Sequence, residues 1–287
     1  MKKILIVLGH NRLTGVNTWA FTLGDFLIRK GYRVDFEIKK DFEYEPKLEI
    51  SILNSLNTLR TTIYEKTLPD YNSYDRCILN YNVHQKFMLP EQIIFVSHGS
   101  MFEPYTPFGK VYAHVAVSER TKKATNADLV IHNGIDLNKF SIKRFPRTPP
   151  TKALNIFRGI PNYSIYRACT NLGIEYRHVG AALNIETEIV PNDIIIGYGR
   201  SAYEGMASGK AVLVHGPFGT DGWVKPENFE KLLYRNCSGW TGAYFPTLQE
   251  LMELIDQYDA VDGRHNRALA EKYLSAETMA NKFEELF

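Results

Sequence analysis

Residues 194–214 have the pattern of a phosphate-binding turn between two strands. They read as an apolar strand, a Gly-Tyr-Gly turn, a helix, a second glycine turn and another strand. The start of a helix presents backbone N–H groups and the positive end of the helix dipole, and glycine lets a backbone approach its ligand closely. These properties suit a diphosphate, to which Arg200 would add a full positive charge. The residues predicted to bind it are Gly197, Gly199, Arg200 and Ser201.

Glu204 lies in the same predicted helix and has two interpretations. The run from Ser201 to Glu204 matches a capping box, in which a glutamate bonds back to the backbone N–H of the cap residue three positions earlier. A carboxylate at this place can also accept hydrogen bonds from the two vicinal hydroxyls of a ribose, as acidic residues do in nucleotide-binding folds. The sequence leaves both roles open.

Alternating strand and helix patterns indicate an α/β fold in two domains. The apolar run 4–8 is typical of a strand buried on both faces of a parallel sheet, and a helical pattern follows it. Similar units continue through the chain, and the proline-rich, basic stretch 143–150 interrupts them. We predict a Rossmann-like N-terminal domain over residues 1–142, a linker over 143–152, and a Rossmann-like C-terminal domain with terminal helices over 153–287.

Composition argues against several classes of protein. The 287 residues include 34 Lys and Arg against 32 Asp and Glu, a formal charge of +2, which argues against a general nucleic-acid binder. Three separated cysteines and histidines without metal-ligand spacing argue against a metal site and fit a reducing compartment. The first apolar run is too short for a signal peptide, and no segment approaches the roughly 18 apolar residues of a membrane span. We expect a cytoplasmic protein without a transmembrane segment.

Four segments share their order and spacing with one known family. They are Thr-Gly-Val-Asn at 14–17 with Gly-Tyr-Arg-Val at 31–34, Ala-Val-Ser-Glu at 116–119, Val-Ile-His-Asn-Gly-Ile-Asp at 130–136 with Phe140, and Tyr-Glu-Gly-Met-Ala-Ser-Gly-Lys-Ala-Val at 203–212. The last is similar to the signature EAMACGxPV. Together they resemble the GT-B glycosyltransferases, especially the retaining group called family 4.

The resemblance implies two Rossmann-like domains that face one another across a cleft. The C-terminal domain would hold a nucleotide-diphosphate sugar. There Glu204 would bind the ribose hydroxyls, Gly15 of the other domain would approach the donor diphosphate, and Arg158 would act near the place of the family's phosphate-binding arginine, although the order here is Arg-Gly instead of Gly-Arg. Arg158 is therefore a predicted catalytic residue.

The N-terminal domain would hold the acceptor. His98 follows a strand where the family often places a histidine close to the transferred sugar, so we predict it as the second catalytic residue. His10 and Asn11 lie in the loop after the first strand and are predicted to contact the acceptor. The class of acceptor cannot be read from the sequence.

Two features depart from the family pattern. The family's Glu-x7-Glu motif places a carboxylate eight residues before Glu204, and this chain has Ile196 there. The family's lysine a few residues beyond its phosphate arginine has no clear counterpart. The sequence has no Asp-x-Asp motif, so Arg158, Arg200 and helix N-termini would stabilise the departing diphosphate without a metal ion or cofactor.

The resemblance thus implies a glycosyltransferase of hexosyltransferase type that is retaining and metal-independent. A GT-B sugar-nucleotide epimerase would share the fold and use no acceptor. A catalytically degenerate GT-B module would bind a nucleotide-sugar or a partner without turnover, and Ile196 keeps this alternative open. A dinucleotide-dependent oxidoreductase fits less well, because the loop after the first strand lacks the Gly-x-Gly-x-x-Gly pattern.

Overall fold

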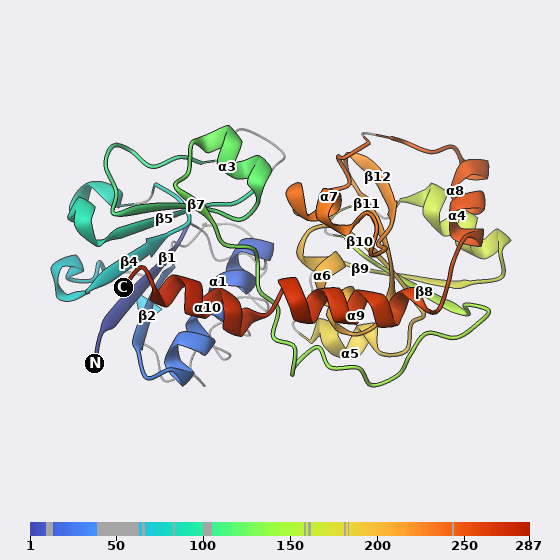
Figure 1. Ribbon diagram of the computed structural model, residues 1–287, viewed down its shortest axis with the longest axis horizontal. Helices are drawn as coiled ribbons and strands as arrows, with labels where there is room; N and C mark the ends of the chain where they lie inside the picture. The colour runs from blue at the N-terminus through green and yellow to red at the C-terminus, as the bar shows by residue number, and fades with distance from the viewer. Residues whose placement is uncertain are drawn as a thin grey trace. The chain divides into compact units, whose positions relative to one another are not determined.

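The protein folds into two α/β units, which confirms the predicted fold class. The computed structural model divides the chain into Met1–Gly134 with Ala276–Phe287, and Ile135–Ser275 (Figure 1). It describes residues 1–9, 14–38, 63–64, 67–82, 84–99, 105–157, 159, 162–180, 182, 184–242 and 244–287. Within these residues, none of the helices is long and apolar enough to cross a membrane.

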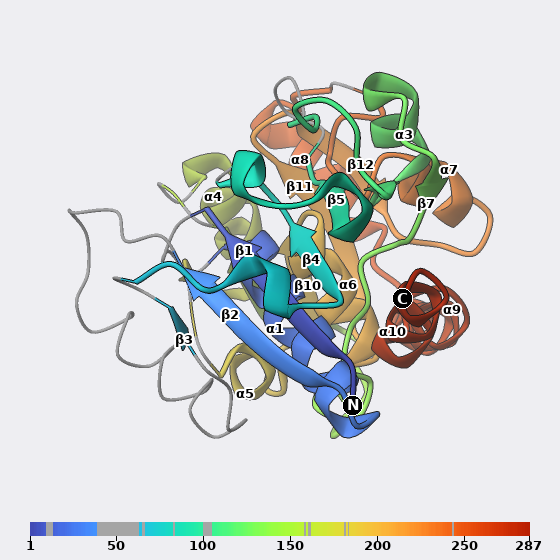
Figure 2. The same ribbon diagram turned by 90° about the vertical axis from the view of Figure 1, so that its left-hand side faces the viewer.

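The first unit is built on a seven-stranded parallel sheet in the order β3-β2-β1-β4-β5-β6-β7. Figure 2 faces this unit and shows β2, β1 and β4 side by side. The strand order reverses between β1 and β4, which is the kind of position where open α/β sheets bind ligands at the carboxyl ends of their strands. Its elements are β1 (Lys3–Leu8), α1 (Gly15–Arg29), β2 (Arg33–Ile38), β3 (Ile63–Tyr64), η1 (Tyr71–Ser73), β4 (Arg76–Leu79), η2 (Gln85–Phe87), η3 (Pro90–Gln92), β5 (Ile93–Ser97), β6 (Ala113–Ala116), α3 (Glu119–Thr125), β7 (Leu129–Val130) and α10 (Ala276–Glu284).

The C-terminal helix α10 belongs to the first unit and packs along α1 (Figure 1). Trp19 of α1 contacts Phe283 of α10 edge to face, with ring centroids 5.7 Å apart, and both side chains are buried. The predicted C-terminal domain, 153–287, therefore includes a segment that packs elsewhere. Nothing in the local helical pattern of this segment specifies its packing partner, because an amphipathic helix can bury its apolar face against any complementary surface.

The second unit is built on a five-stranded sheet in the order β12-β11-β10-β8-β9. The strands are parallel except for β12, which pairs antiparallel with β11. Its elements are β8 (Lys152–Ile156), α4 (Tyr163–Asn171), β9 (Glu175–Val179), α5 (Ile185–Ile189), β10 (Ile194–Gly197), α6 (Arg200–Ala207), β11 (Ala211–Gly216), β12 (Gly219–Trp223), α7 (Phe229–Tyr234), α8 (Leu248–Asp256) and α9 (Asp262–Tyr273).

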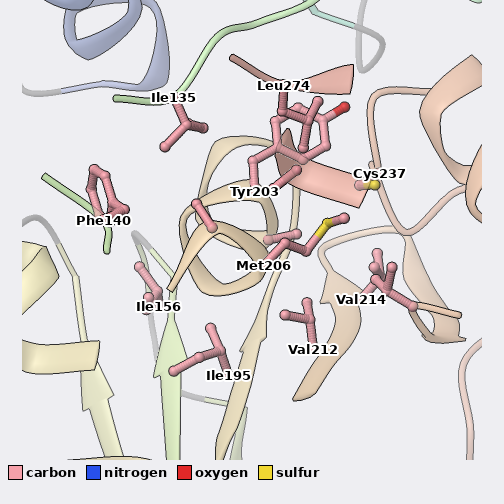
Figure 3. Packing of buried hydrophobic residues seen from close by; sticks show 14 of the residues in the cluster. Ile135, Phe140, Ile156, Ile195, Tyr203, Met206, Val212, Val214, Cys237 and Leu274 are labelled. Carbon is pink, nitrogen blue, oxygen red and sulfur yellow. The ribbon is translucent and has the colours of Figure 1, made fainter. Parts of the chain in front are cut away.

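Alternate residues of β10 face two separate cores in this unit. Ile195 packs with Tyr203 and Met206 of α6, and Figure 3 shows these side chains above the strands of the sheet. Ile194 and Ile196 instead belong to the core that contains buried residues of α4 and α8. This division follows from the strand geometry, in which successive side chains point to opposite faces of a sheet.

The predicted linker, 143–152, packs inside the second unit. The buried ammonium group of Lys210 donates a hydrogen bond to the carbonyl oxygen of Arg144, and the Arg144 guanidinium pairs with Asp193 at 2.8 Å. Ile135, before the linker, is already buried in the core of this unit. The units therefore divide at residues 134 and 135, earlier than the proline-rich composition suggested.

Candidate functional site

A two-residue turn joins β10 to α6 at the carboxyl end of the strand. Gly199 is the N-cap residue of α6 and has φ 54° and ψ −126°, a conformation that L side chains rarely adopt. Its N–H donates to the carbonyl oxygen of Cys237 at 2.7 Å, which fixes the turn against a neighbouring loop. No side chain caps the N-terminus of α6 among the described residues. The turn therefore presents the start of this helix without a side-chain cap, as the diphosphate prediction requires.

Replacing Gly199 with alanine tests whether this turn depends on glycine. We expect Gly199→Ala to lower the free energy of unfolding by about 1–3 kcal/mol, because a Cβ forces the backbone away from its positive φ. The measurement is urea unfolding followed by circular dichroism. Gly180→Ala is the matched control, since a Cβ there meets nothing nearer than 4.0 Å. A Gly199 variant as stable as the control variant would contradict the role of the turn.

The capping-box interpretation of Glu204 is wrong. The box requires Ser201 as the cap residue, but the helix begins at Arg200 and its cap is Gly199. Ser201 is therefore the second residue of α6, and its backbone N–H bonds to the carbonyl oxygen of Tyr198 at 3.2 Å. The Glu204 side chain pairs with Arg200 one turn earlier, with Nε and Oε1 3.2 Å apart.

Four charged side chains, which we call the charge cluster, lie around the start of α6: Lys139, Glu186, Arg200 and Glu204. The side chains of Arg200 and Glu204 are each only 10% exposed. Burial raises the pKa of Glu204 above its ordinary value and outweighs the neighbouring cations Arg200 and Lys139, which lower it. Lys139 Nζ lies 3.4 Å from Glu186 Oε2.

The charge cluster has the groups that a nucleoside diphosphate needs. A guanidinium at a helix N-terminus binds phosphate oxygens, and a carboxylate accepts hydrogen bonds from ribose hydroxyls. Sequence reasoning missed Lys139 and Glu186, because they come from the segment before β8 and from α5 and share no local motif with Glu204. Among the described residues, no three His, Cys, Asp or Glu side chains are gathered as a metal ion would require.

His98 lies in the first unit, directly after β5. Its Nε2 is 2.6 Å from Oδ1 of Asn80, and the indole of Trp19 meets its ring edge to face with centroids 4.6 Å apart. Burial lowers the pKa of His98 to about 3, so the imidazole is neutral at physiological pH. This side chain can therefore donate and accept hydrogen bonds but does not act as a cation.

The predicted site residues fall into three groups. Gly197, Gly199, Arg200, Ser201 and Glu204 lie together at the β10–α6 turn of the second unit. Gly15 and His98 lie in the first unit, where Gly15 is the first residue of α1 and its cap is Thr14. Trp19, one turn further along α1, makes the contact with His98. His10, Asn11 and Arg158 lie outside the described residues.

Known structures share this architecture. No protein-family model matches the chain, and no curated protein is similar to it in sequence. HepE from Anabaena, solved with UDP and glucose, has 13% identity over 99% of both chains and a TM-score of 0.64. A variant of TarM from S. aureus, solved with UDP, fondaparinux and α-GlcNAc-glycerol, has 11% identity over 100% of this chain and 99% of its own, with a TM-score of 0.59.

The likeness extends to a protein of a different reaction class. A candidate UDP-N-acetylglucosamine 2-epimerase from Listeria monocytogenes has 10% identity over 99% of this chain and 94% of its own, with a TM-score of 0.53. Identities this low compare folds and not activities. The likenesses confirm the predicted GT-B fold.

Proposed function

We propose that this protein is a retaining, metal-independent glycosyltransferase of the family 4 type that uses a nucleoside-diphosphate sugar as donor. The observation that carries the proposal is the buried pair of Arg200 and Glu204 at a helix start that no described side chain caps. HepE and TarM, which share the fold, were both solved with UDP. A buried cation and carboxylate side by side offer one partner to the diphosphate and one to the ribose.

In the proposed donor complex, the nucleotide exchanges the partners of the ion pair. Phosphate oxygens would accept from the Arg200 guanidinium and from backbone N–H groups of the β10–α6 turn, while the ribose hydroxyls would donate to Glu204. Each charged group then keeps a partner of opposite polarity. Both side chains are only 10% exposed, and such interactions are stronger where less water surrounds them.

The proposed chemistry follows from the charges that develop as the donor breaks down. Cleavage of the bond between the anomeric carbon and the diphosphate oxygen leaves negative charge on the diphosphate, which Arg200 and Arg158 would stabilise. The acceptor hydroxyl would attack the anomeric carbon from the face that the diphosphate leaves, and its proton would pass to the departing diphosphate oxygen. His98 would contact the transferred hexosyl group, and His10 and Asn11 the acceptor.

Cysteine usage supports a cytoplasmic site of action as part of this proposal. The thiols of Cys77, Cys169 and Cys237 are free and buried. Burial raises the pKa of Cys77 and of Cys169 to about 12, which keeps both thiols protonated and unreactive. Unpaired thiols of this kind are typical of reducing compartments.

The pH dependence of UDP binding tests the role of Glu204. We expect wild type to bind UDP about tenfold more tightly than Glu204→Gln near pH 8, because an ionised carboxylate accepts stronger hydrogen bonds than an amide. Because burial raises the pKa of Glu204 above 4.5, this advantage should shrink as the pH falls, beginning above pH 4.5. Isothermal titration calorimetry at several pH values measures both affinities.

Comparing wild type with Glu204→Gln separates the titration of Glu204 from the titration of UDP. The phosphate groups of UDP also titrate in this range, but they do so equally with both proteins, so only the ratio of affinities is informative. A ratio of one at every pH would mean that Glu204 does not contact the nucleotide. Circular dichroism on Glu204→Gln ensures that a folded variant is compared.

A sugar-nucleotide epimerase is the second candidate, favoured by the likeness to the Listeria protein. An epimerase would convert UDP-N-acetylglucosamine to an isomer, or release free UDP, with no acceptor present. A transferase would leave most of the donor intact until an acceptor is added. Incubation of the protein with UDP-N-acetylglucosamine alone, followed by chromatography and NMR of the products, distinguishes the two.

A further inference from the structure

Asn80 connects the carboxyl ends of three neighbouring strands in the first unit. It follows β4 directly, and its side chain is buried, with 2% of the residue exposed. Its Nδ2 donates to the carbonyl oxygen of Val7 in β1 at 3.3 Å, and its Oδ1 lies 2.6 Å from Nε2 of His98 after β5. Because β4 pairs with both β1 and β5, one amide spans the sheet at the point where the strand order reverses.

The bond to Val7 determines which way the Asn80 amide points. A flipped amide would place its oxygen against the Val7 carbonyl oxygen, and two acceptors repel each other. Oδ1 therefore faces His98, and a carbonyl oxygen only accepts hydrogen bonds. The proton shared between the two side chains must belong to Nε2 of His98.

The protonation of Nε2 determines the chemistry of the opposite ring nitrogen. Burial holds the pKa of His98 at about 3, so the ring carries one proton and Nδ1 keeps its lone pair. Trp19 contacts the imidazole edge to face at an interplanar angle of 75°, and Trp19 itself is buried. The imidazole cannot rotate without displacing this indole, so the direction of the Nδ1 lone pair is fixed.

We propose that Asn80 is a positioning residue that holds His98 in the Nε2–H tautomer and so makes Nδ1 a hydrogen-bond acceptor for a hydroxyl group of the substrate. The proposal rests on the proposed function, in which His98 contacts the transferred sugar. It deepens that function by giving His98 a defined role: the side chain recognises a hydroxyl group and does not donate a proton. A substrate with a carboxylate in place of this hydroxyl group would be disfavoured, because the negative charge would face the lone pair of Nδ1.

The tautomer of His98 can be observed directly by NMR, without any ligand. The full-length protein is labelled with ¹⁵N-histidine, and the long-range ¹H–¹⁵N spectrum reports the tautomer of each of the eight histidines. His98→Gln identifies the His98 signals. We expect the wild-type spectrum to show Nε2 protonated and Nδ1 unprotonated, and Asn80→Ala to give a mixture of both tautomers.

Asn80→Asp provides the stronger variant, because it keeps the shape of the side chain and adds a negative charge. A carboxylate stabilises the imidazolium, so we expect Asn80→Asp to keep Nε2 protonated and to raise the pKa of His98 by about one unit or more. If the side chain at position 80 did not contact Nε2 of His98, this pKa would not change. This variant therefore tests the proposal even if Asn80→Ala fails to fold.

Asn155→Ala is the matched control, since Asn155 is a buried asparagine of the second unit that donates to the Tyr176 hydroxyl. It should leave the His98 signals unchanged. A wild-type His98 protonated at Nδ1, or a His98 pKa that does not change in Asn80→Asp, would overturn the proposal.

UDP binding to the charge cluster is measured separately. A fixed tautomer in a protein that does not bind UDP would leave the positioning role intact and reject the proposed function.

Discussion

Replacing Ile196 with glutamate should destabilise the folded protein strongly. We expect Ile196→Glu to lower the free energy of unfolding by about 4 kcal/mol or more, because it places a carboxyl group in an apolar core. Ile196 is fully buried and shares its cluster with residues of α4 and α8. The amide of the neighbouring Asn155 already donates to Tyr176 and brings no positive charge to the position. Urea unfolding and the melting temperature measure the loss.

Ile196→Val is the control for this variant. It removes one methylene group from the same core and should cost about 0.5–1.5 kcal/mol. If Ile196→Glu proved as stable as Ile196→Val, the side chain at this position would have to reach solvent or the charge cluster, and the assignment of β10 to two separate cores would be wrong. The expected loss also means that this substitution cannot serve to restore a missing carboxylate.

The position of Ile196 explains why the family's Glu-x7-Glu spacing could not be applied to this chain by counting back from Glu204. Here only Tyr198 and Gly199 join β10 to α6, so the eighth position before Glu204 falls inside a strand and faces the core. Because position 196 faces the core, the missing glutamate does not by itself decide between an active enzyme and a degenerate module, which must be tested by turnover.

Local patterns predicted the elements better than their packing. The apolar run of β10 and the two glycines after it specify strand, turn and helix over a few residues, and the structure has all three. The start of α6 was harder to predict. The helix begins at Arg200 because Gly199 has an unusual backbone conformation, whereas the sequence pattern fits a start with Ser201 as the cap residue equally well. Similarly, the proline-rich composition of 143–150 indicated a linker, whereas its hydrogen bonds with Lys210 and Asp193 place it inside the second unit.

The functional partners that the sequence did not reveal are distant along the chain. Asn80 reaches His98 only because β4 and β5 are neighbours in the sheet, and Glu186 reaches the charge cluster only because α5 packs near the start of α6. Such pairs follow from the topology of strands and helices. The α/β pattern predicted the class of topology but not the register that brings these side chains together.

Replacing Arg200 and replacing Glu204 should lower the free energy of unfolding by unequal amounts. We expect Glu204→Leu to cost about 3–5 kcal/mol, because it leaves Arg200 buried without its carboxylate and a guanidinium does not lose its proton. Arg200→Met should cost less, because Glu204 can take up a proton. The pKa of Glu204 is raised in the folded protein, so protonation of this carboxyl group stabilises the fold. This contribution is fully present below pH 4.5 and is lost as the pH rises through the pKa that Glu204 has in the folded protein. The Arg200→Met protein should therefore be closest to wild type at acid pH.

The double variant Arg200→Met with Glu204→Leu separates structure from binding. It removes both charges, so we expect its stability to approach or exceed that of wild type, since apolar side chains can replace a buried ion pair. It should nevertheless bind UDP at least about tenfold more weakly, because each lost charge-assisted hydrogen bond contributes about 1.5–3 kcal/mol. Urea unfolding at pH 5 and pH 8, with calorimetric titration of UDP, measures both effects.

The pair of Asp25 and Arg29 on α1 has the same helical spacing and provides the control, because its side chains are 24% and 52% exposed. Asp25→Leu with Arg29→Met should change stability by no more than about 1 kcal/mol, because ion pairs near the surface contribute little, and should leave UDP binding unchanged. A stable double variant at positions 200 and 204 that still bound UDP with wild-type affinity would show that the buried pair is structural. The nucleotide would then bind elsewhere, and the proposed donor site would be rejected. If the same variant is stable but does not bind UDP, the buried pair serves ligand binding. The folded protein would then not need Arg200 and Glu204 for its own stability.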